Sequence, residues 1–360
     1  MTLSLSLEKR LEPTPWVPLL PALSVALALP AGGVVLAIAG TNPWEAYKEM
    51  ALGAFGSLYG LSETVVKAIP LLLAGLGVAL AFRMLFWNIG AEGQLHLGAL
   101  GATWVALNAP DLPAPLLQPL MILAAFFAGA AWGLIPATLK VYAGLNEIIT
   151  TLMMNYIAIL WMDFLVYGPW KDPHGFGFPF TAPFPPAARL LKLPGSRIHL
   201  GLALGLAAAG LLAVLLWRTR VGYEIRIIGL NPRAARYAGM NIPKVTLLVL
   251  ALSGGLAGLA GLSEVAGIQG RLKHGLSPGY GYTAIIVAWL ARLNPWAVVG
   301  VSVLLGGLLV GGDMLQIAMG LPVTMTYILQ GLILFFVLGM EVLSGYRLIL
   351  RRRGSSRAKT

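Results

Sequence analysis

The sequence predicts an all-α membrane protein, a polytopic bundle of about ten transmembrane helices that fills residues 1–360 as one domain. The first observation is composition: 58% of residues are hydrophobic, only 11% are charged, and mean hydropathy is +0.80. Soluble chains carry about a quarter charged residues. The second is that apolar runs of about 20 residues, the length that crosses a hydrocarbon core, recur along the whole chain. The third is that Lys and Arg gather in particular connecting segments between these runs.

Each predicted span is an apolar run bounded by polar or charged residues. The run that begins at Trp16 is longer than a signal-peptide core and has no obvious cleavage site, so we expect it to remain as the first span. The spans are predicted at residues 16–40, 63–82, 92–108, 117–139, 148–167, 200–217, 245–266, 282–291, 295–315 and 322–344. The run at 282–291 is too short to cross the bilayer unaided.

The distribution of basic residues predicts that both termini are cytoplasmic. With that orientation, 17 of the 25 Lys and Arg residues fall on the cytoplasmic side and 8 fall outside. The positive-inside rule requires this bias, and the reverse orientation would invert it. The segment 218–244 and the basic tail 347–360 then lie in the cytoplasm, whereas 169–197 and 267–282 form extracytoplasmic loops.

Several function classes are disfavoured by residues that are absent or dispersed. There is no cysteine, which excludes disulfides and thiol chemistry. No segment matches GxxxxGK[ST], so ATP phosphates would have to bind another chain. The net charge of +11 lies between apolar runs rather than in a soluble basic module, which argues against nucleic acid. No catalytic residue is predicted, because the four Asp residues lie far apart, and no metal site is predicted, because the four His residues show no paired spacing: His96, His174, His199 and His274.

Polar residues inside apolar spans are the candidates for a substrate path, because each is costly unless it faces a cavity or a partner. Asn88 and Glu92 lie in a glycine-flanked segment where the backbone can break. The alternative is a turn that places Glu92 in the first turn of a helix. Thr151 and Asn155 share a helix face, after a helix start capped by Asn146. They either line the path or fix helix packing by hydrogen bonds.

Two further segments combine polar residues with glycine and proline. Residues 264–282 favour a re-entrant turn or a plain loop equally, with Glu264 and Gln269 the candidates to face a path. The cytoplasmic segment 218–244 contains a predicted short helix, Pro232–Ala238, which Asn231 caps and Gly239 ends. A docking element is favoured there over a simple tether.

Three strings in these segments resemble a known family. They are FWNIGAEGQLHLGALGA (86–102), LNEIITTLMMNYIA (145–158) and RIIGLNPRAARYAGMNI (226–242). Their order and content resemble the permeases of bacterial ABC importers for nucleosides and simple sugars, and the similarity extends over nearly the whole chain. The nucleoside branch is the most similar, because it carries a long first extracytoplasmic segment and an NEIITTLMMNYIA-like string.

The resemblance implies partners rather than a cofactor in this chain. Such permeases pair with a second related permease, here expected as a heterodimer, in the bacterial plasma membrane. A cytoplasmic ATPase binds ATP and Mg²⁺, and an extracytoplasmic binding lipoprotein delivers the ligand. The resemblance assigns an ATPase-coupling loop that comprises Arg226, Gly229, Asn231, Pro232, Ala235, Tyr237 and Gly239. It transfers no individual substrate-binding residue.

The function expected is import of a nucleoside, or a related simple sugar, by alternating access. The alternative is an ion-coupled carrier that works without an ATPase and uses Glu92, Glu147 or Glu264 as ion sites. The two hypotheses differ in whether this chain transports alone.

Overall fold

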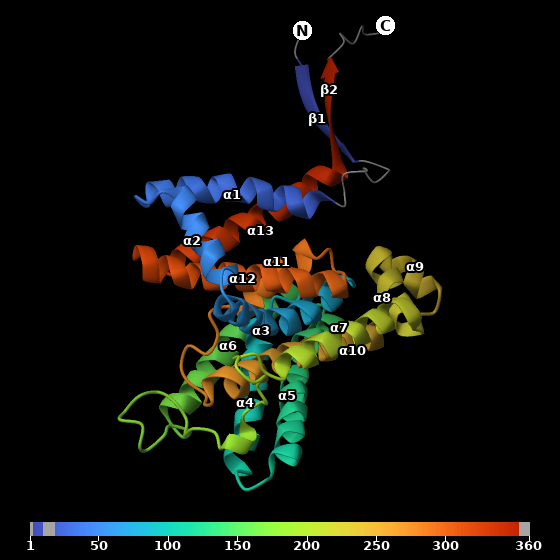
Figure 1. Cartoon of the computed structure of the whole chain (residues 1–360). Helices are drawn as coiled ribbons and strands as arrows, with labels where there is room; N and C mark the ends of the chain where they lie inside the picture. Colours follow the sequence, from blue (N-terminus) through green and yellow to red (C-terminus); the bar gives the residue numbers. More distant parts are fainter. Residues whose placement is uncertain (1–2, 10–18, 353–360) are drawn as a thin grey trace, which may run out of the picture. The chain divides into compact units, whose positions relative to one another are not determined.

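The computed structural model describes residues 3–9 and 19–352 of the chain, and in this part the protein is helical apart from two short strands. Figure 1 shows the elements. The helices are α1 (Leu20–Ile38), α2 (Pro43–Phe55), α3 (Leu58–Phe82), α4 (Ala91–Asn108), α5 (Ala114–Ala143), α6 (Glu147–Tyr167), α7 (Gly201–Arg218), α8 (Arg220–Leu230), α9 (Pro232–Tyr237), α10 (Ile242–Leu262), α11 (Tyr280–Leu290), α12 (Pro295–Met319) and α13 (Thr324–Gly345), with a 3-10 turn η2 (Pro186–Ala188) and a π-helix η3 (Ser263–Gln269).

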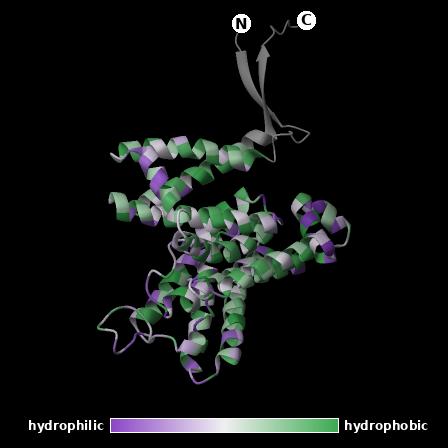
Figure 2. Cartoon of the chain, in the orientation of Figure 1, coloured by the Kyte–Doolittle hydropathy of each residue, from purple (hydrophilic) through white to green (hydrophobic). Residues whose placement is uncertain are grey.

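The prediction of a polytopic helical bundle is confirmed. Every predicted span coincides with a helix, although residues 16–18 of the first lie outside the described part of the chain. Within that part, seven helices are long and apolar enough to cross a membrane. Of the others at predicted spans, α11 and α13 contribute shorter apolar stretches, and α4 carries polar residues near its start. Figure 2 shows apolar residues along the long helices and polar ones in α8, α9 and the loops.

The sequence did not predict α2, α8 or the strands β1 (Leu3–Lys9) and β2 (Tyr346–Arg352). The strands pair antiparallel from Leu3 opposite Arg352 to Lys9 opposite Tyr346. The two ends of the described chain therefore lie together. Residues 347–352 of the predicted basic tail thus belong to β2, while residues 353–360 lie outside the described residues.

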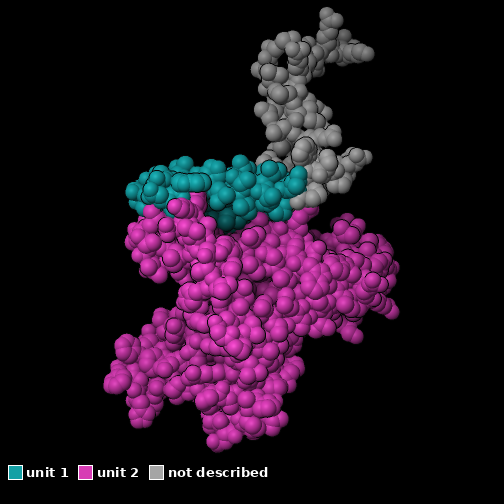
Figure 3. Space-filling model, in the orientation of Figure 1, with its two compact units in different colours: residues 1–45, 324–360 teal, residues 46–323 magenta. Residues whose placement is uncertain are grey.

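The chain forms two compact units, coloured separately in Figure 3. Unit 1 comprises residues 1–45 and 324–360, in which α1 packs on α13. Unit 2 comprises residues 46–323, with α3 and α10 at its centre. In unit 2, α4 and α5 pack against α10, while α7, α11 and α12 pack against α3.

Side-chain caps explain why many of these helices begin where they do. The backbone N–H groups in the first turn of a helix have no hydrogen-bond partner within the helix. At these positions an Asn, Ser or Thr side chain accepts a hydrogen bond from one of them. The capping residues are Ser57, Asn146, Thr219, Asn231, Asn241 and Asn294. The predicted caps at Asn146 and Asn231 are confirmed.

Glycines let the central helices approach to backbone contact. A Cβ on Gly98 of α4 would overlap the backbone of Gly258 in α10, and a Cβ on Gly258 would overlap the carbonyl oxygen of Ala125 in α5. Small residues serve this purpose at helix crossings in membranes, where van der Waals contact drives association. The α4–α5–α10 crossing therefore depends on glycine.

We predict that Gly258→Ala destabilises unit 2 by about 1 to 3 kcal/mol, because the added methyl group meets backbone that cannot move aside. The measurement is thermal unfolding of the purified protein in detergent. Gly300→Ala is the matched control, because Gly300 lies on an exposed position of α12 with no atom within 4 Å of an added Cβ. Equal melting temperatures for the two variants would contradict the prediction.

Candidate functional site

The turn between α3 and α4 interrupts the helical path inside unit 2, and Asn88 satisfies its backbone. The Asn88 side chain is fully buried and donates to Gln94 Oε1 (3.1 Å) and Ser253 Oγ (3.0 Å). Its Oδ1 accepts the Gly90 N–H at 3.0 Å. Asn88 therefore ties the turn to the start of α4 and to α10.

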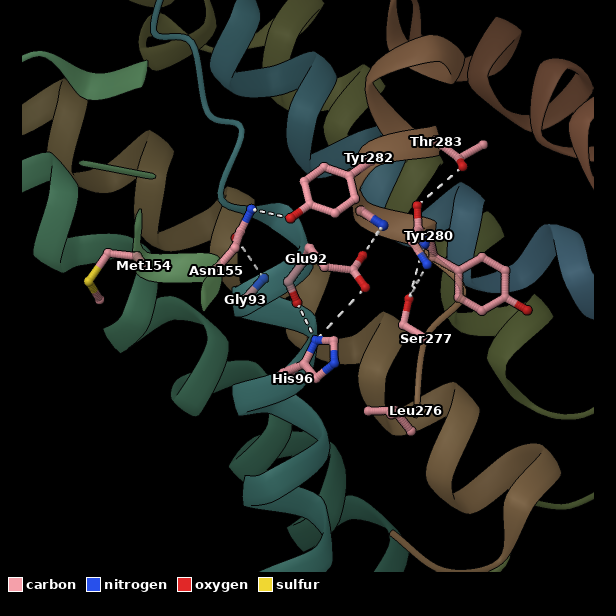
Figure 4. Close-up of polar contacts among 12 residues, drawn as sticks. Glu92, Gly93, His96, Met154, Asn155, Leu276, Ser277, Tyr280, Tyr282 and Thr283 are labelled. Atoms are coloured by element: carbon pink, nitrogen blue, oxygen red, sulfur yellow. Dashed lines mark hydrogen bonds and ion pairs between the residues drawn. The ribbon is translucent and has the colours of Figure 1, made fainter. Parts of the chain in front are cut away.

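Two side chains of α6 hold the same turn from the other side. Thr151 Oγ1 accepts the Ile89 N–H at 3.3 Å. Asn155 Oδ1 accepts the Gly93 N–H at 2.8 Å, and Asn155 Nδ2 donates to the Ile89 carbonyl at 2.9 Å. Because the amide uses both ends on one backbone segment, Asn155 fixes α6 against the start of α4 (Figure 4).

Glu92 joins α4 to α11. Its side chain is 2% exposed, and its Oε2 accepts the Gly281 N–H at 2.6 Å. Gly281 lies in the first turn of α11, so the carboxylate lies at the N-terminus of that helix as well as its own, where negative charge is favoured. A Cβ on Gly281 would overlap the Glu92 backbone, and Tyr282 next to it receives a hydrogen bond from Asn155 Nδ2 at 3.3 Å.

Four of the six predicted path residues thus meet in one buried network: Asn88, Glu92, Thr151 and Asn155. Their hydrogen bonds run to groups of the chain itself, where α4, α6, α10 and α11 meet. For Thr151 and Asn155 this arrangement favours the alternative of helix packing. For Asn88 and Glu92 it fits the alternative of a turn that leads into the first turn of a helix. The place of all four on a substrate path stays a prediction.

Glu264 and Gln269 lie apart from this network, in the π-helix η3 that continues α10. Gln269 Nε2 donates to Glu264 Oε2 (3.2 Å) and to the Leu276 carbonyl (3.0 Å). Glu264 Oε1 and Gln269 Oε1 are buried and have no hydrogen-bond partner among the described residues. π-Helical turns occur frequently at functional sites.

The two predicted extracytoplasmic loops pair with each other. The Thr181 N–H donates to the Leu272 carbonyl at 2.9 Å, and the Phe184 N–H donates to the Gly270 carbonyl at 2.8 Å. The Arg271 guanidinium lies over the Phe180 ring at 4.5 Å from its centroid. The loop at 169–197 is therefore hydrogen-bonded to the segment that follows η3.

The segment 218–244 forms α8 and α9 rather than one short helix in a loop, and it has two distinct faces. On the outward face, Leu230 is 82% and Tyr237 is 95% exposed. On the inward face, Ala235 is fully buried, and a Cβ on Gly229 would overlap the carbonyl oxygen of Arg83 at the end of α3.

The junction at Arg83 extends to the α11–α12 turn. Arg83 Nε donates to the Leu293 carbonyl at 3.0 Å, in a turn where Arg292 and Leu293 both have positive φ. A cavity of about 500 Å³ beside this junction is lined by parts of 84–86, 140–147 and 228–246. The connections at 84–86, 140–147 and 228–246 thus meet at one end of unit 2. The charge pattern predicts that they share one side of the membrane. The loop before α7 lies at the other end (Figure 1).

The sequence analysis missed two charged residues inside spans. Lys67 of α3 and Asp313 of α12 form an ion pair at 3.5 Å. Their side chains are 29% and 51% exposed. The same rule that selected Glu92 would have found them, because ionisable residues within spans are rare and functional by default. Lys67 was instead counted only as a basic residue of the outer side.

The bundle is that of a protein with several membrane-spanning helices, and sequence comparison gives its family. The family model described as "Branched-chain amino acid transport system / permease component" matches residues 60–338. The chain belongs to this family of ABC transporter permeases, and it is a transport subunit rather than an enzyme.

Individual relatives agree over nearly the full length. The chain is 40% identical to the glucose ABC transporter permease protein TsgB13 of Haloferax volcanii, over 99% of this chain and 97% of that protein. It is 33% identical to the guanosine ABC transporter permease protein NupP of Bacillus subtilis, over 94% and 98%. A second guanosine permease of that organism, NupQ, is 26% identical over 68% of this chain and 78% of its own length.

We predict that Asn155→Leu lowers thermal stability strongly, because it leaves the buried Gly93 N–H and Ile89 carbonyl without partners, at about 1 to 3 kcal/mol each. Tyr282→Phe removes only the 3.3 Å hydrogen bond and is the matched control. Thermal unfolding in detergent compares the two. A Tyr282→Phe variant as unstable as Asn155→Leu would show that the backbone bonds are not the essential contacts.

We also predict that acid weakens the loop before α7 through His199. Its side chain is 3% exposed, its Nδ1 accepts the Gly201 N–H at 3.2 Å, and Nε2 has no partner among the described residues. Burial, and to a smaller extent Lys192, lowers the pKa of His199 from 6.5 to about 4. Because the unfolded state binds the proton more readily, stability is fully present above about pH 6.5 and is lost as pH falls toward about 4.

Hydrogen exchange of residues 190–205 between pH 7 and pH 4.5 measures this effect, after correction for the intrinsic exchange rate. His199→Gln should flatten the pH dependence, whereas His174→Gln, at an exposed site, should not. An unchanged profile in His199→Gln would contradict the assignment.

Proposed function

We propose that this chain forms half of the translocation path of an ATP-driven importer for a nucleoside or a simple sugar. The relatives are named for glucose and for guanosine. These two compounds share a polyhydroxylated ring and differ in everything else. The cargo proposed here is therefore a neutral ligand with such a ring, and its other substituents are left to the delivery protein.

The proposed assembly contains three kinds of partner. A cytoplasmic ATPase binds ATP and Mg²⁺, because this chain has no phosphate-binding motif. A second, related permease completes the path; the two guanosine permeases of one organism, NupP and NupQ, support a heterodimer. An extracytoplasmic binding lipoprotein delivers the cargo to the face that carries the paired loops. We propose, because of their basic residues, that α8, α9 and both termini lie on the cytoplasmic side of the plasma membrane.

The α8–α9 projection is the observation that carries the proposal. Its outward face presents two large apolar side chains, Leu230 and Tyr237, which is unfavourable in water and fits a protein surface. Its inward face is seated on the end of α3 through Gly229. A partner that moves α9 therefore moves the junction at Arg83. In alternating access such a rigid-body motion shifts the population between outward-open and inward-open states.

Reconstitution in liposomes tests the proposal. The chain would be co-expressed with its genomic neighbours and purified as the complex. Uptake of labelled adenosine, guanosine, uridine, ribose and glucose would then be measured with and without ATP and binding protein. ATP-dependent uptake of at least one of these compounds is expected only with the partner chains present. Uptake by this chain alone, driven by an ion gradient and indifferent to ATP, would replace the proposal with the ion-coupled carrier.

Two variants separate docking from transmission, and we predict different outcomes for them. Tyr237→Ala removes an exposed side chain and is expected to lower the amount of ATPase that copurifies. Gly229→Ala places a methyl group on the Arg83 carbonyl and is expected to keep the ATPase but to lower cargo moved per ATP hydrolysed at least tenfold. Gly300→Ala serves as the control. Unaltered coupling in Gly229→Ala would mean that the Arg83 junction does not transmit motion.

A further inference from the structure

The Lys67–Asp313 ion pair lies at a depth where exposed charge is not tolerated by lipid. Lys67 is nine residues from the start of α3, about 13 Å along its axis, and Asp313 is six residues from the end of α12, about 9 Å. Both side chains are partly exposed on helices that span the membrane. Charged residues within spans face a water-filled cavity or a protein partner. The same is therefore expected of this pair.

Behind the pair lies a second set of polar groups. Glu264 is 4% exposed, and Lys67 is close enough to interact with it electrostatically. Tyr280, 3% exposed, lies close enough to hydrogen-bond the Glu264 carboxyl group and to interact electrostatically with Asp313. Polar groups therefore run from the exposed Asp313 inward to Glu264 and Gln269, across α12, α3, α11 and η3.

Two oxygens at the inner end of this set need a hydrogen-bond donor. Glu264 Oε1 and Gln269 Oε1 are both buried acceptors without a partner among the described residues. An unpaired buried acceptor costs about 1 to 3 kcal/mol. Glu264 and Gln269 are already joined through Gln269 Nε2, so their free oxygens belong to one rigid unit. A ligand that carries two donors could satisfy both oxygens at once.

We infer that Lys67, Asp313, Glu264 and Gln269 form a cargo-binding site that recognises the hydroxyl groups of a polyhydroxylated ring. Carboxylate and amide oxygens accept hydrogen bonds from hydroxyl groups, and a lysine ammonium donates to the hydroxyl oxygen. Two carboxylates around one lysine also disfavour an anion, so the site takes a nucleoside or a free sugar and rejects the corresponding phosphate ester. This inference rests on the proposed function, and it adds where and by which atoms the cargo is read.

The experiment uses the reconstituted complex with ATP and saturating binding protein. Uptake of a ribonucleoside and its 2′-deoxy and 5′-phosphate analogues would be measured for the wild type and for Glu264→Gln, Gln269→Ala and the double variant Lys67→Met/Asp313→Asn. Gly300→Ala, at an exposed position of α12 with no atom within 4 Å of the added Cβ, is the control. The binding protein is the same in every sample, so a change in the ratio between ligands comes from the permease.

The expected result is a loss of about tenfold in ribonucleoside uptake for Gln269→Ala and Glu264→Gln, one hydrogen bond each, with a smaller loss for the deoxy analogue. The double variant should transport the phosphate ester relatively better.

A structural role would lower the uptake of all three ligands equally and would overturn the inference. So would loss of the second permease from the purified double variant, because the pair would then belong to a subunit interface. If the wild type transports none of the ligands, the proposed function fails; normal wild-type uptake with unchanged variants defeats this inference alone.

Discussion

The constraint on which this structure depends is that the hydrocarbon core offers no water to backbone groups. A helix interrupted inside the bundle exposes N–H and C=O groups that must be satisfied by the protein. The α3–α4 turn is such an interruption, and Asn88, Thr151 and Asn155 supply its missing partners. The amide is the side chain suited to this work, because it accepts and donates at once. The N–H groups of Ile89, Gly90 and Gly93 are therefore all hydrogen-bonded to side chains.

Close approach of backbones is the second requirement, and it follows from the first. Short side chains such as Asn155 reach a neighbouring backbone only when the helices lie nearly in contact. Gly93 and Gly281 allow this contact, since a Cβ on the first would crowd the Asn155 backbone and one on the second would overlap Glu92. The glycine content of these segments is thus a condition for the hydrogen bonds, not a source of flexibility.

Local sequence was sufficient to predict where the helices lie, but not which groups their polar side chains contact. Apolar runs predicted the spans because length and composition decide membrane insertion, and the caps at Asn146 and Asn231 follow from contacts within four residues. Which group Asn155 binds depends on a segment more than 60 residues away. The π-helix after α10 and the pairing of β1 with β2 depend on long-range contacts in the same way. α8 was missed because its basic residues and central glycine resemble a loop.

The position of Glu92 illustrates the limit of residue type as evidence. A carboxylate beside glycines within a span fitted an ion site, a substrate contact and a helix terminus equally well. The structure shows the helix-terminus contact, a hydrogen bond from the Gly281 N–H, and that bond depends on how α11 is placed. The path role of Glu92 stays a prediction.

α11 itself joins the two parts of unit 2 that the sequence treated separately. Its 11 residues form a rod of about 16 Å, with Gly281 bound to Glu92 at one end. Beyond the other end, the Leu293 carbonyl receives the hydrogen bond of Arg83, against which Gly229 of α8 is seated. A rod of three turns does not shorten or bend appreciably under such contacts. We therefore expect a displacement of the α8–α9 projection that moves the α11–α12 turn to move the start of α11 as well, and with it the contacts of Glu92 and Asn155.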